Sequence, residues 1–512
     1  MKLKDGKATN DIPTEYVKHS MGSREFVVEI TKLYETIWMT KAIPKDWGHS
    51  KLIILWNGAE KGKAVEPKTY RALQIRSSLC KILVIIIINR LREWYENQLV
   101  DQQQGFRSAR GTTDGIFVAK RVQQITDKMK MSAPILFVDL TAAFDHVERS
   151  WLFKTIEKRF PKGSKNDLVQ LLKSIYSYTS TSLAETPEDK FELTVGVRQG
   201  GPESPMLYNL YMDFVMRIYI DACNTKGIKF LKLKYNIPSS ASSTGNNAVG
   251  NFTLDWCGYA DDLLLVFEDE DSLRKGVKLL DEIFTRYRLD INTSKTKTMI
   301  LNQQYEEREY PATISTLRGC ELENVKTYRY LGCEVKYDEP TTGETELNLR
   351  SDAAECKFYS LARNLMNMKI RLTTRIRILN SLVRSRIVYS CQTWSTTKVQ
   401  LNRMNALYLT FIRKMVKGGY KRKGDTWSFV FSNEDLIRMA KTTDLSSYIR
   451  KQQRNYAGHI IRKENSSIVK RLFFNSNASH KPGRQTTLHS SVIMAEKRTK
   501  EEFYTDAINR KF

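Results

Sequence analysis

Short apolar runs that end on acidic residues are the clearest pattern in the middle of the chain. Two such runs, Leu254–Tyr259 and Leu263–Phe267, lie on either side of Ala260, Asp261 and Asp262. This pattern predicts a strand, a tight turn and a second strand, with two adjacent carboxylates at the turn. Further upstream, the β-rich run from Pro134 ends on a single carboxylate, Asp139. The sequence therefore predicts three acids delivered by strand ends.

The most apolar run of the chain, Ile82–Ile88, lies between Lys81 and Arg90. It is far too short to span a bilayer. Its continuation through Leu91 and Trp94 at helical spacing predicts a buried helix instead. The hydrophobic pattern thus contains no membrane-spanning segment.

Further helices are predicted from apolar positions at helical spacing. One begins near Ser204 and carries a core stripe, and a second runs from Ser272 to about Tyr287. A third helical region, Leu361–Tyr389, has five arginines between its apolar positions, so one face can pack while another meets phosphate. The stretch Ser239–Asn251 is rich in Ser, Gly and Asn, which predicts a flexible insertion. The core stripe of the helix that begins near Ser204 is Leu207, Leu210, Tyr211 and Phe214. The five arginines of the third helical region are Arg371, Arg375, Arg377, Arg384 and Arg386.

Charge is distributed unevenly along the chain. The 512 residues carry a net charge of +25, yet residues 351–512 alone have 32 Lys or Arg against 11 Asp or Glu. The remaining 350 residues are nearly neutral, with 50 basic and 46 acidic side chains. A solvated basic surface would explain the excess, but its density and interleaved aromatics favour a second domain that grips a polyanion.

Cysteine usage excludes several classes of protein. The seven cysteines are scattered and form no C-x-x-C pair, and the N-terminus carries no secretory signal. Neither a zinc site nor a disulfide framework is expected. The chain is predicted to be intracellular, in the nucleus or the cytoplasm, with no membrane partner.

Asp139, Asp261 and Asp262 have two possible interpretations. The simpler one is an ordinary hairpin turn and an ordinary strand end. The other is a phosphoryl-transfer site, because uncompensated like charges in a small volume call for divalent cations between them. Two Mg²⁺ ions suit such a site, since Mg²⁺ prefers oxygen ligands, and Mn²⁺ is a possible substitute.

Five segments, two of which contain these aspartates, decide between the interpretations. In chain order they are Phe137–Asp145, Val197–Met206, Tyr259–Asp262, Leu289–Lys295 and Tyr328–Gly332. The series resembles the successive motifs of reverse transcriptases of LINE-type (non-LTR) retrotransposons. The resemblance runs from about residue 43 to about residue 462, and so covers most of the chain.

The resemblance implies a right-hand polymerase of the α+β class. Residues 1–35 would lead into the fingers, and 36–336 would form fingers and palm, with an antiparallel sheet backed by helices. Residues 337–479 would form a basic helical thumb and C-terminal region, and 480–512 an extended, disordered tail. The implied partners are an RNA template, a DNA primer and dNTPs; the oligomeric state is unknown.

The resemblance also implies roles for residues of the active site. Asp139, Asp261 and Asp262 would hold the metals, with the Leu140 carbonyl as a further ligand. Phe144 would lie under the sugar and exclude a 2′-hydroxyl. The loop of Gln199 and Gly200 would contact the nucleotide, and Lys295 would protonate the pyrophosphate leaving group. Arg107 and Arg110 would bind phosphate, Arg71 would contact template or nucleotide, and the hairpin of Tyr328, Tyr330, Leu331 and Gly332 would grip the primer end.

The chain also departs from the family pattern. Gly201 and Glu203 replace a small or thiol residue and an apolar one, and Ala72 replaces a proline. His459, within Asn455–Arg462, is interpreted as structural rather than as a metal ligand. We expect no N-terminal endonuclease and no RNase H. The alternative functions are a degenerate or domesticated copy that binds RNA without polymerising, and an intron maturase.

Overall fold

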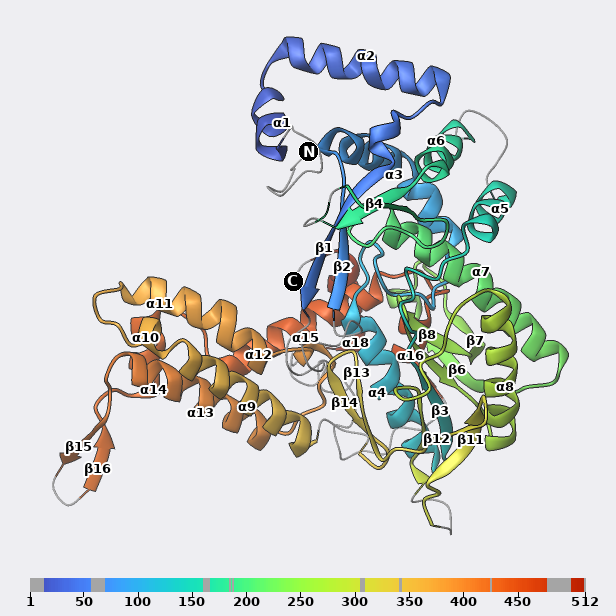
Figure 1. Cartoon of the computed structure of the whole chain (residues 1–512). Coiled ribbons are helices and arrows are strands. Elements are labelled where there is room, and N and C mark those ends of the chain that lie inside the picture. The colour runs from blue at the N-terminus through green and yellow to red at the C-terminus, as the bar shows by residue number, and fades with distance from the viewer. Residues whose placement is uncertain are drawn as a thin grey trace.

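The computed structural model describes residues 13–56, 70–159, 166–183, 186, 188–303, 309–339, 343–423, 426–476 and 499–510. Its elements form a central body of sheets and helices, from which a helical lobe extends to one side (Figure 1). The predicted α+β class is confirmed. The predicted domain boundaries stay predictions.

A four-stranded antiparallel sheet lies at the centre of the body. Its order is β10 (Lys297–Leu301), β3 (Ala133–Val138), β9 (Asp262–Val266) and β8 (Trp256–Tyr259). Every residue of β3 is buried, because both faces of the sheet are covered. On one face Leu136 and Leu263 pack in the core cluster that includes α7 (Ser204–Thr225) and α8 (Glu270–Arg286). On the other face Phe137 and Leu264 pack with α4 (Thr112–Met129).

A second four-stranded sheet lies in the region predicted to form the fingers. Its order is β2 (Tyr70–Ile75), β1 (His49–Trp56), β4 (Ser180–Leu183) and β5 (Lys190–Glu192), and only the β1–β4 pair is parallel. The predicted buried helix at residues 82–94 is confirmed as part of α3, with Ile82, Ile87 and Leu91 buried. The helices of this region are α1 (Thr14–Ser20), α2 (Arg24–Thr40), η1 (Lys45–Trp47), α3 (Ser78–Gln98), α5 (Arg149–Arg159) and α6 (Asn166–Ser177).

The prediction of a flexible insertion at residues 239–251 was wrong. This segment forms η4 (Ser239–Ala241) and most of β7 (Ala248–Leu254), which pairs with β6 (Leu231–Ile237) in a long hairpin. Alternating apolar residues of the hairpin are buried in the same core as α4. Ser, Gly and Asn therefore mark its exposed residues and its turn, which composition alone did not distinguish from a loop. Two smaller hairpins are β11 (Thr313–Leu317) with β12 (Cys320–Glu323), and β13 (Thr327–Tyr330) with β14 (Cys333–Lys336).

The region predicted to form the thumb is a helical lobe with its own hydrophobic core, which includes Phe358, Trp394 and Phe411. Of its predicted phosphate-facing arginines, Arg371, Arg377 and Arg386 are exposed. Arg375 instead is buried and donates to the carbonyls of residues 365, 370 and 415, so its assignment to the phosphate-facing surface was wrong. The elements are α9 (Glu344–Ser360), α10 (Ala362–Leu365), α11 (Leu372–Ile378), the π-helical η6 (Leu379–Arg384), α12 (Ser385–Ile387), η7 (Cys391–Thr393), α13 (Lys398–Met415), β15 (Tyr420–Lys423), β16 (Thr426–Phe429), α14 (Asn433–Ala440) and α15 (Leu445–Ile461).

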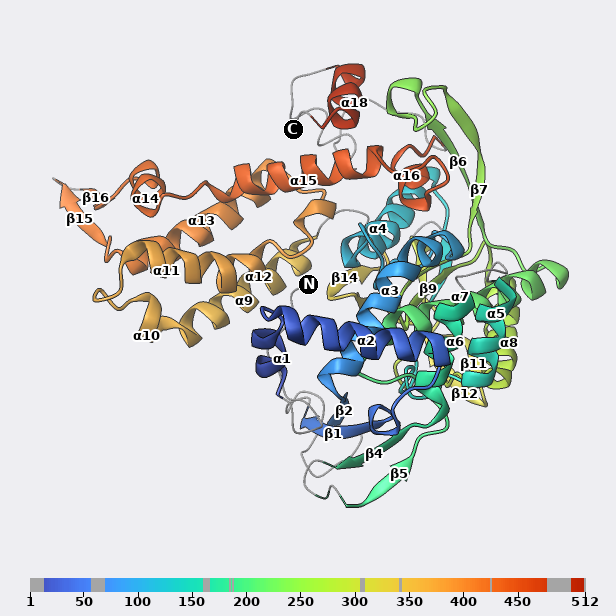
Figure 2. The same ribbon diagram turned by 90° about the horizontal axis from the view of Figure 1, so that it is seen from above.

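After the thumb the chain returns to the body through α15, as Figure 2 shows from above. The next helix, α16 (Ile468–Phe473), packs on α4, and the Phe474 carbonyl accepts a hydrogen bond from the Asn236 amide of β6 at 3.0 Å. The predicted tail at 480–512 is wrong for its described part, because Lys500–Ile508 form α18, with a capping box at Thr499. Residues 480–498 and 511–512 lie outside the described residues.

None of the helices among the described residues is long and apolar enough to cross a membrane.

Substitution of Phe503, a fully buried residue of α18, tests whether this last helix belongs to the folded core. Phe503→Ala is expected to lower the free energy of unfolding by about 3 kcal/mol, since large-to-small changes of buried aromatics leave a cavity. Urea denaturation followed by circular dichroism measures the change. Lys500→Gln, an exposed position on the same helix, is the control; equal stability of both variants would contradict the assignment.

Candidate functional site

The three predicted aspartates lie at neighbouring strand ends of the central sheet. Asp139 directly follows β3, Asp262 is the first residue of β9, and Asp261 lies in the turn before it. Because Val138 pairs with Leu263, the sheet register brings the three carboxylates to one edge. The prediction of strand ends and a tight turn is confirmed.

The turn between β8 and β9 is held by a residue that the sequence did not point to. Ala260 has a φ of 58°, in the left-handed region that costs a non-glycine residue of the order of 1 kcal/mol. The buried side chain of Gln103 bonds both sides of this residue: its Oε1 accepts from the Ala260 amide at 2.9 Å, and its Nε2 donates to the Ala260 carbonyl at 3.3 Å. Gln103 therefore fixes the backbone that presents Asp261.

The electrostatics of this edge reflect burial of Asp261 first and the charges around it second. Burial raises the pKa of Asp261, and the charge of Asp139 raises it further, while Lys295 and Arg71 act in the opposite direction. Lys295 Nζ lies 3.0 Å from Asp139 Oδ2. Arg71, on β2 of the fingers, thus lies near enough to act on the acids of the palm. Both cations predicted to serve the site belong to its charge balance.

Hard carboxylate oxygens are the donors that Mg²⁺ prefers. As the side chains lie, however, no three His, Cys, Asp or Glu residues of the described ranges are grouped closely enough to hold a metal ion. Lys295 occupies one of the carboxylates instead. The chemistry of the donor set fits a divalent metal, and the metal ligands stay a prediction.

Segment 289–296 supports the end of β3. Leu140 forms a β-bridge with Ile291, and the Asn292 amide donates to the Asp139 carbonyl at 2.9 Å. Thr296 Oγ1 accepts from the Asp139 amide at 3.3 Å. The motif that delivers Lys295 therefore also fixes the backbone of Asp139 and places Leu140 beside it.

An aromatic stack lies next to the carboxylates. Phe144 is half-buried and stacks on Tyr208 of α7, with ring centroids 4.7 Å apart and an interplanar angle of 8°. Phe106 meets Phe144 edge-on at 6.3 Å. Tyr208 is fully buried, and its pKa is raised by burial first and then by Asp261 and Asp262. Tyr208 thus packs against one face of the Phe144 ring and supports it near the acids.

The loop of Gln199 and Gly200 joins palm and fingers. Gln199 Nε2 donates to Asp145 Oδ2 at 2.9 Å, and its carbonyl accepts from the Gln74 amide of β2 at 2.8 Å. Gly200 has a φ of 100°, and a Cβ there would lie 3.2 Å from the Gln74 carbonyl oxygen. Only glycine lets the two backbones approach in this way.

Glu203 does not face the nucleotide loop as an unpaired acid. It is fully buried at the start of α7, forms an ion pair with the buried Arg76, and accepts from Tyr176 Oη at 3.1 Å. A Cβ at Gly201 would lie 2.8 Å from Glu203 Oε2, so the two departures from the family pattern fit each other. Arg76 compensates the charge of Glu203, so this acid adds no unpaired negative charge next to the nucleotide loop.

Arg107 and Arg110, on the loop before α4, bond to other groups of the protein. Arg107 is buried, and its guanidinium donates to the Glu96 carboxylate at 3.0 Å and to the carbonyls of Glu96, Val100 and Gln103. Arg110 pairs with Asp101 at 2.6 Å. In this arrangement both side chains stabilise the loop from within the protein, and their contact with phosphate stays a prediction.

The predicted primer-grip hairpin is β13–β14. Its turn residues Leu331 and Gly332 have φ values of 48° and 79°, and the Leu331 carbonyl accepts from Tyr389 of the thumb at 2.8 Å. Tyr328 stacks on Phe137 of β3 at 4.0 Å, and Tyr330 is buried against the same ring. Tyr328 and Tyr330 therefore anchor the hairpin on the central sheet. Its turn contacts the helical lobe through the bond between Leu331 and Tyr389.

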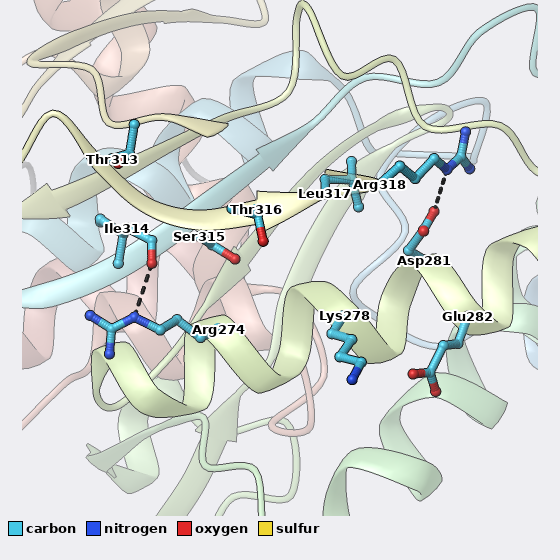
Figure 3. A pocket seen from close by; sticks show the side chains of 10 residues that line it. All are labelled: Arg274, Lys278, Asp281, Glu282, Thr313, Ile314, Ser315, Thr316, Leu317 and Arg318. Carbon is cyan, nitrogen blue, oxygen red and sulfur yellow. Dashed lines mark hydrogen bonds and ion pairs between the residues drawn. The ribbon is translucent and has the colours of Figure 1, made fainter. Parts of the chain in front are cut away.

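A cavity of about 660 Å³ lies between α8 and β11 (Figure 3), away from the predicted site residues. Arg318 Nε donates to Asp281 at 2.8 Å and Arg274 Nε to the Ile314 carbonyl at 2.9 Å across it. None of the predicted site residues lines this cavity, so it is not the candidate site.

An antiparallel palm sheet with three aspartates at one edge, flanked by fingers and a basic thumb, is the arrangement of a nucleic-acid polymerase. Residues 59–335 match the family "Reverse transcriptase (RNA-dependent DNA polymerase)". This match covers more than half of the chain, which therefore belongs to that family.

Retrotransposon proteins are similar to the chain at low identity. A Pol polyprotein from the type-1 retrotransposable element R2 of Nasonia vitripennis is 22% identical over 406 residues, which are 78% of this chain and 35% of the relative. The Pol polyprotein of element R2DM of Drosophila melanogaster is 24% identical, over 48% of this chain and 21% of its own length. The probable RNA-directed DNA polymerase of transposon BS of Drosophila melanogaster is 26% identical, over 36% and 20%.

These relatives confirm the resemblance to LINE-type reverse transcriptases, and the chain spans about a third or less of their length. Among solved structures, telomerase from Candida tropicalis in complex with a fragment of telomeric RNA aligns with 87% of this chain and 68% of its own. The identity is 13% and the TM-score 0.36, too low to place any residue.

The pair of Arg76 and Glu203 allows a test of its energetics. Glu203→Gln is expected to lower the free energy of unfolding by about 3 kcal/mol, because it leaves a buried arginine uncompensated. The double variant Arg76→Met/Glu203→Leu should regain most of that loss, since apolar groups replace both charges. Thermal and urea denaturation of the two variants measure this. A loss below about 1 kcal/mol in Glu203→Gln would mean that the pair is solvated, as surface pairs are.

Proposed function

We propose that the chain is an RNA-directed DNA polymerase, which extends a primer 3′-hydroxyl with dNTPs on an RNA template and releases pyrophosphate. The observation that carries the proposal is the gathering of Asp139, Asp261 and Asp262 at one sheet edge with the pKa of Asp261 raised. Family membership supports the reaction class.

The metal site of the proposed enzyme would consist of the three aspartates and the Leu140 carbonyl. When bound there, two Mg²⁺ ions, or Mn²⁺ in their place, would activate the primer hydroxyl and stabilise the leaving oxygen. Lys295 must leave Asp139 for this site to form. The Lys295 side chain is 60% exposed, which supports such a release.

The chain's own residues have distinct roles in the proposed reaction. Lys295, once released, would donate a proton to the pyrophosphate leaving group. Phe144, held by Tyr208, would exclude a 2′-hydroxyl by steric contact with its ring. The backbone at Gly200 and the amide of Gln199 would contact the incoming nucleotide, and Arg71 would approach it from the fingers.

Primer and template would lie between palm and thumb. The turn of Leu331 and Gly332 would contact the primer end. The exposed Arg371, Arg377 and Arg386 of the thumb would contact backbone phosphates, whose neutralisation supplies most non-specific affinity.

The decisive variant for the proposed chemistry is Asp261→Asn. Removal of one metal-binding charge should abolish primer extension with Mg²⁺ and dNTPs, while affinity for the primer–template stays within about twofold, because phosphate contacts dominate that affinity. A denaturing gel measures primer extension on an RNA template. Fluorescence anisotropy measures the affinity for the primer–template.

The matched control is Asp271→Asn, an exposed acid of α8 paired with Lys275. It should extend the primer as wild type does. If the wild type binds primer–template and fails to extend it, the polymerase assignment falls, and an RNA-binding relic remains.

The sugar selectivity assigned to Phe144 has its own test. Phe144→Val should open space for a 2′-hydroxyl and lower the preference for dNTP over rNTP, as a ratio of kcat/KM, by about 100-fold. Steady-state single-nucleotide incorporation measures it. Tyr176→Phe, which keeps the ring but removes the hydroxyl bound to Glu203, is a control for indirect effects; an unchanged preference in Phe144→Val would remove Phe144 from this role.

A further inference from the structure

A cleft of about 270 Å³ lies where the end of α15 meets the last described helix, α18, and Asn455, His459, Arg462 and Arg510 line it. The first three are spaced by four and three residues, so they share one face of α15. Arg510 reaches the same space from just beyond the end of α18. The segment Asn455–Arg462 lies at the end of the stretch that resembles LINE-type reverse transcriptases, and the proposed polymerase does not use it.

The lining of the cleft is cationic and contains no carboxylate. Within the described part of the chain, neither Arg462 nor Arg510 forms an ion pair. Burial lowers the pKa of Arg462, and the charge of Arg510 lowers it further. Two guanidinium groups therefore share a small open space without a compensating acid.

The cleft is built on a fixed framework. Arg462 Nη1 donates to the Ala507 carbonyl of α18 at 2.7 Å, which leaves its other N–H groups for a ligand. His459 Nε2 lies 3.1 Å from the carbonyl oxygen of Ala109, so this ring is held against the loop that precedes α4. Lys463 beside it is already engaged with Asp114 at 3.6 Å. The arginines and Asn455 are the groups available to bind.

We propose that this cleft binds a backbone phosphate of a nucleic-acid strand, outside the catalytic groove. Planar guanidinium groups donate paired hydrogen bonds to phosphate oxygens, and the Asn455 amide supplies a further donor. The contact of His459 with Ala109 joins the cleft to the loop that carries Arg107 and Arg110. The site goes beyond the proposed polymerase reaction and does not depend on it.

The test is the binding of a fluorescent oligouridylate and of an oligothymidylate of equal length to the full chain, over a series of KCl concentrations. Arg510→Gln should weaken binding roughly threefold to fivefold at low salt, and lessen the salt slope of log Kd by about 0.7, the value for one lost phosphate on a single strand. Arg510→Lys, which keeps the charge but loses the fork, should restore the slope.

Lys500→Gln removes an equal charge at the opposite end of α18 and is the matched control; it should change neither quantity. Asn455→Ala provides a second variant that leaves Arg462 and its bond to α18 in place. Identical slopes in Arg510→Gln and Lys500→Gln would overturn the proposal. So would competition by inorganic phosphate that depends on Arg510 while strand binding does not, because the ligand would then be free phosphate. Primer extension is measured in parallel. If the wild type fails to extend the primer, the proposed polymerase function is contradicted, but the strand-binding result for the cleft still stands.

Discussion

The placement of three carboxylates at one edge of the central sheet is the constraint on which the rest of the structure depends. Asp139, Asp261 and Asp262 are held together by strand register and by the clamp of Gln103 on a left-handed turn residue. Like charges at close range are unfavourable unless cations neutralise them. Lys295 supplies one such charge, and the proposed metals would supply the rest. Fingers, palm and thumb then act as the frame that keeps these acids in place.

The frame is closed by contacts between segments far apart in the sequence. The nucleotide loop is bonded to β2 through Gln199 and Gln74, and the primer-grip turn to the thumb through Leu331 and Tyr389. The C-terminal helices return across α4 and pack beside the β6–β7 hairpin. Much of the basic C-terminal third is therefore part of the folded body, and the arginines that remain exposed are those available to nucleic acid.

Local pattern was sufficient for the elements with strong periodicity. The strands that carry the acids, the buried helix at residues 82–94 and the buried Leu207, Leu210 and Tyr211 of α7 were predictable from hydrophobic spacing, whereas Phe214 of the same stripe is only partly buried. The partners of buried polar groups were not. Gln103, Tyr208 and Arg76 are remote in sequence from Ala260, Phe144 and Glu203, and no local pattern signals such pairings. The ordered hairpin at 239–251 and helix α18 were missed for a related reason, since their stability comes from tertiary packing that composition does not reveal.

The most direct test of the central claim is a count of metal ions at the carboxylates. Mn²⁺ binding, followed by electron paramagnetic resonance, would be measured on the complex with dNTP and a primer that lacks its 3′-hydroxyl. The account predicts two Mn²⁺ ions per chain in the wild type and a loss of at least one in Asp261→Asn. Equal binding by both proteins would contradict it, because the metals would then lie elsewhere than at the edge formed by β3 and the β8–β9 turn.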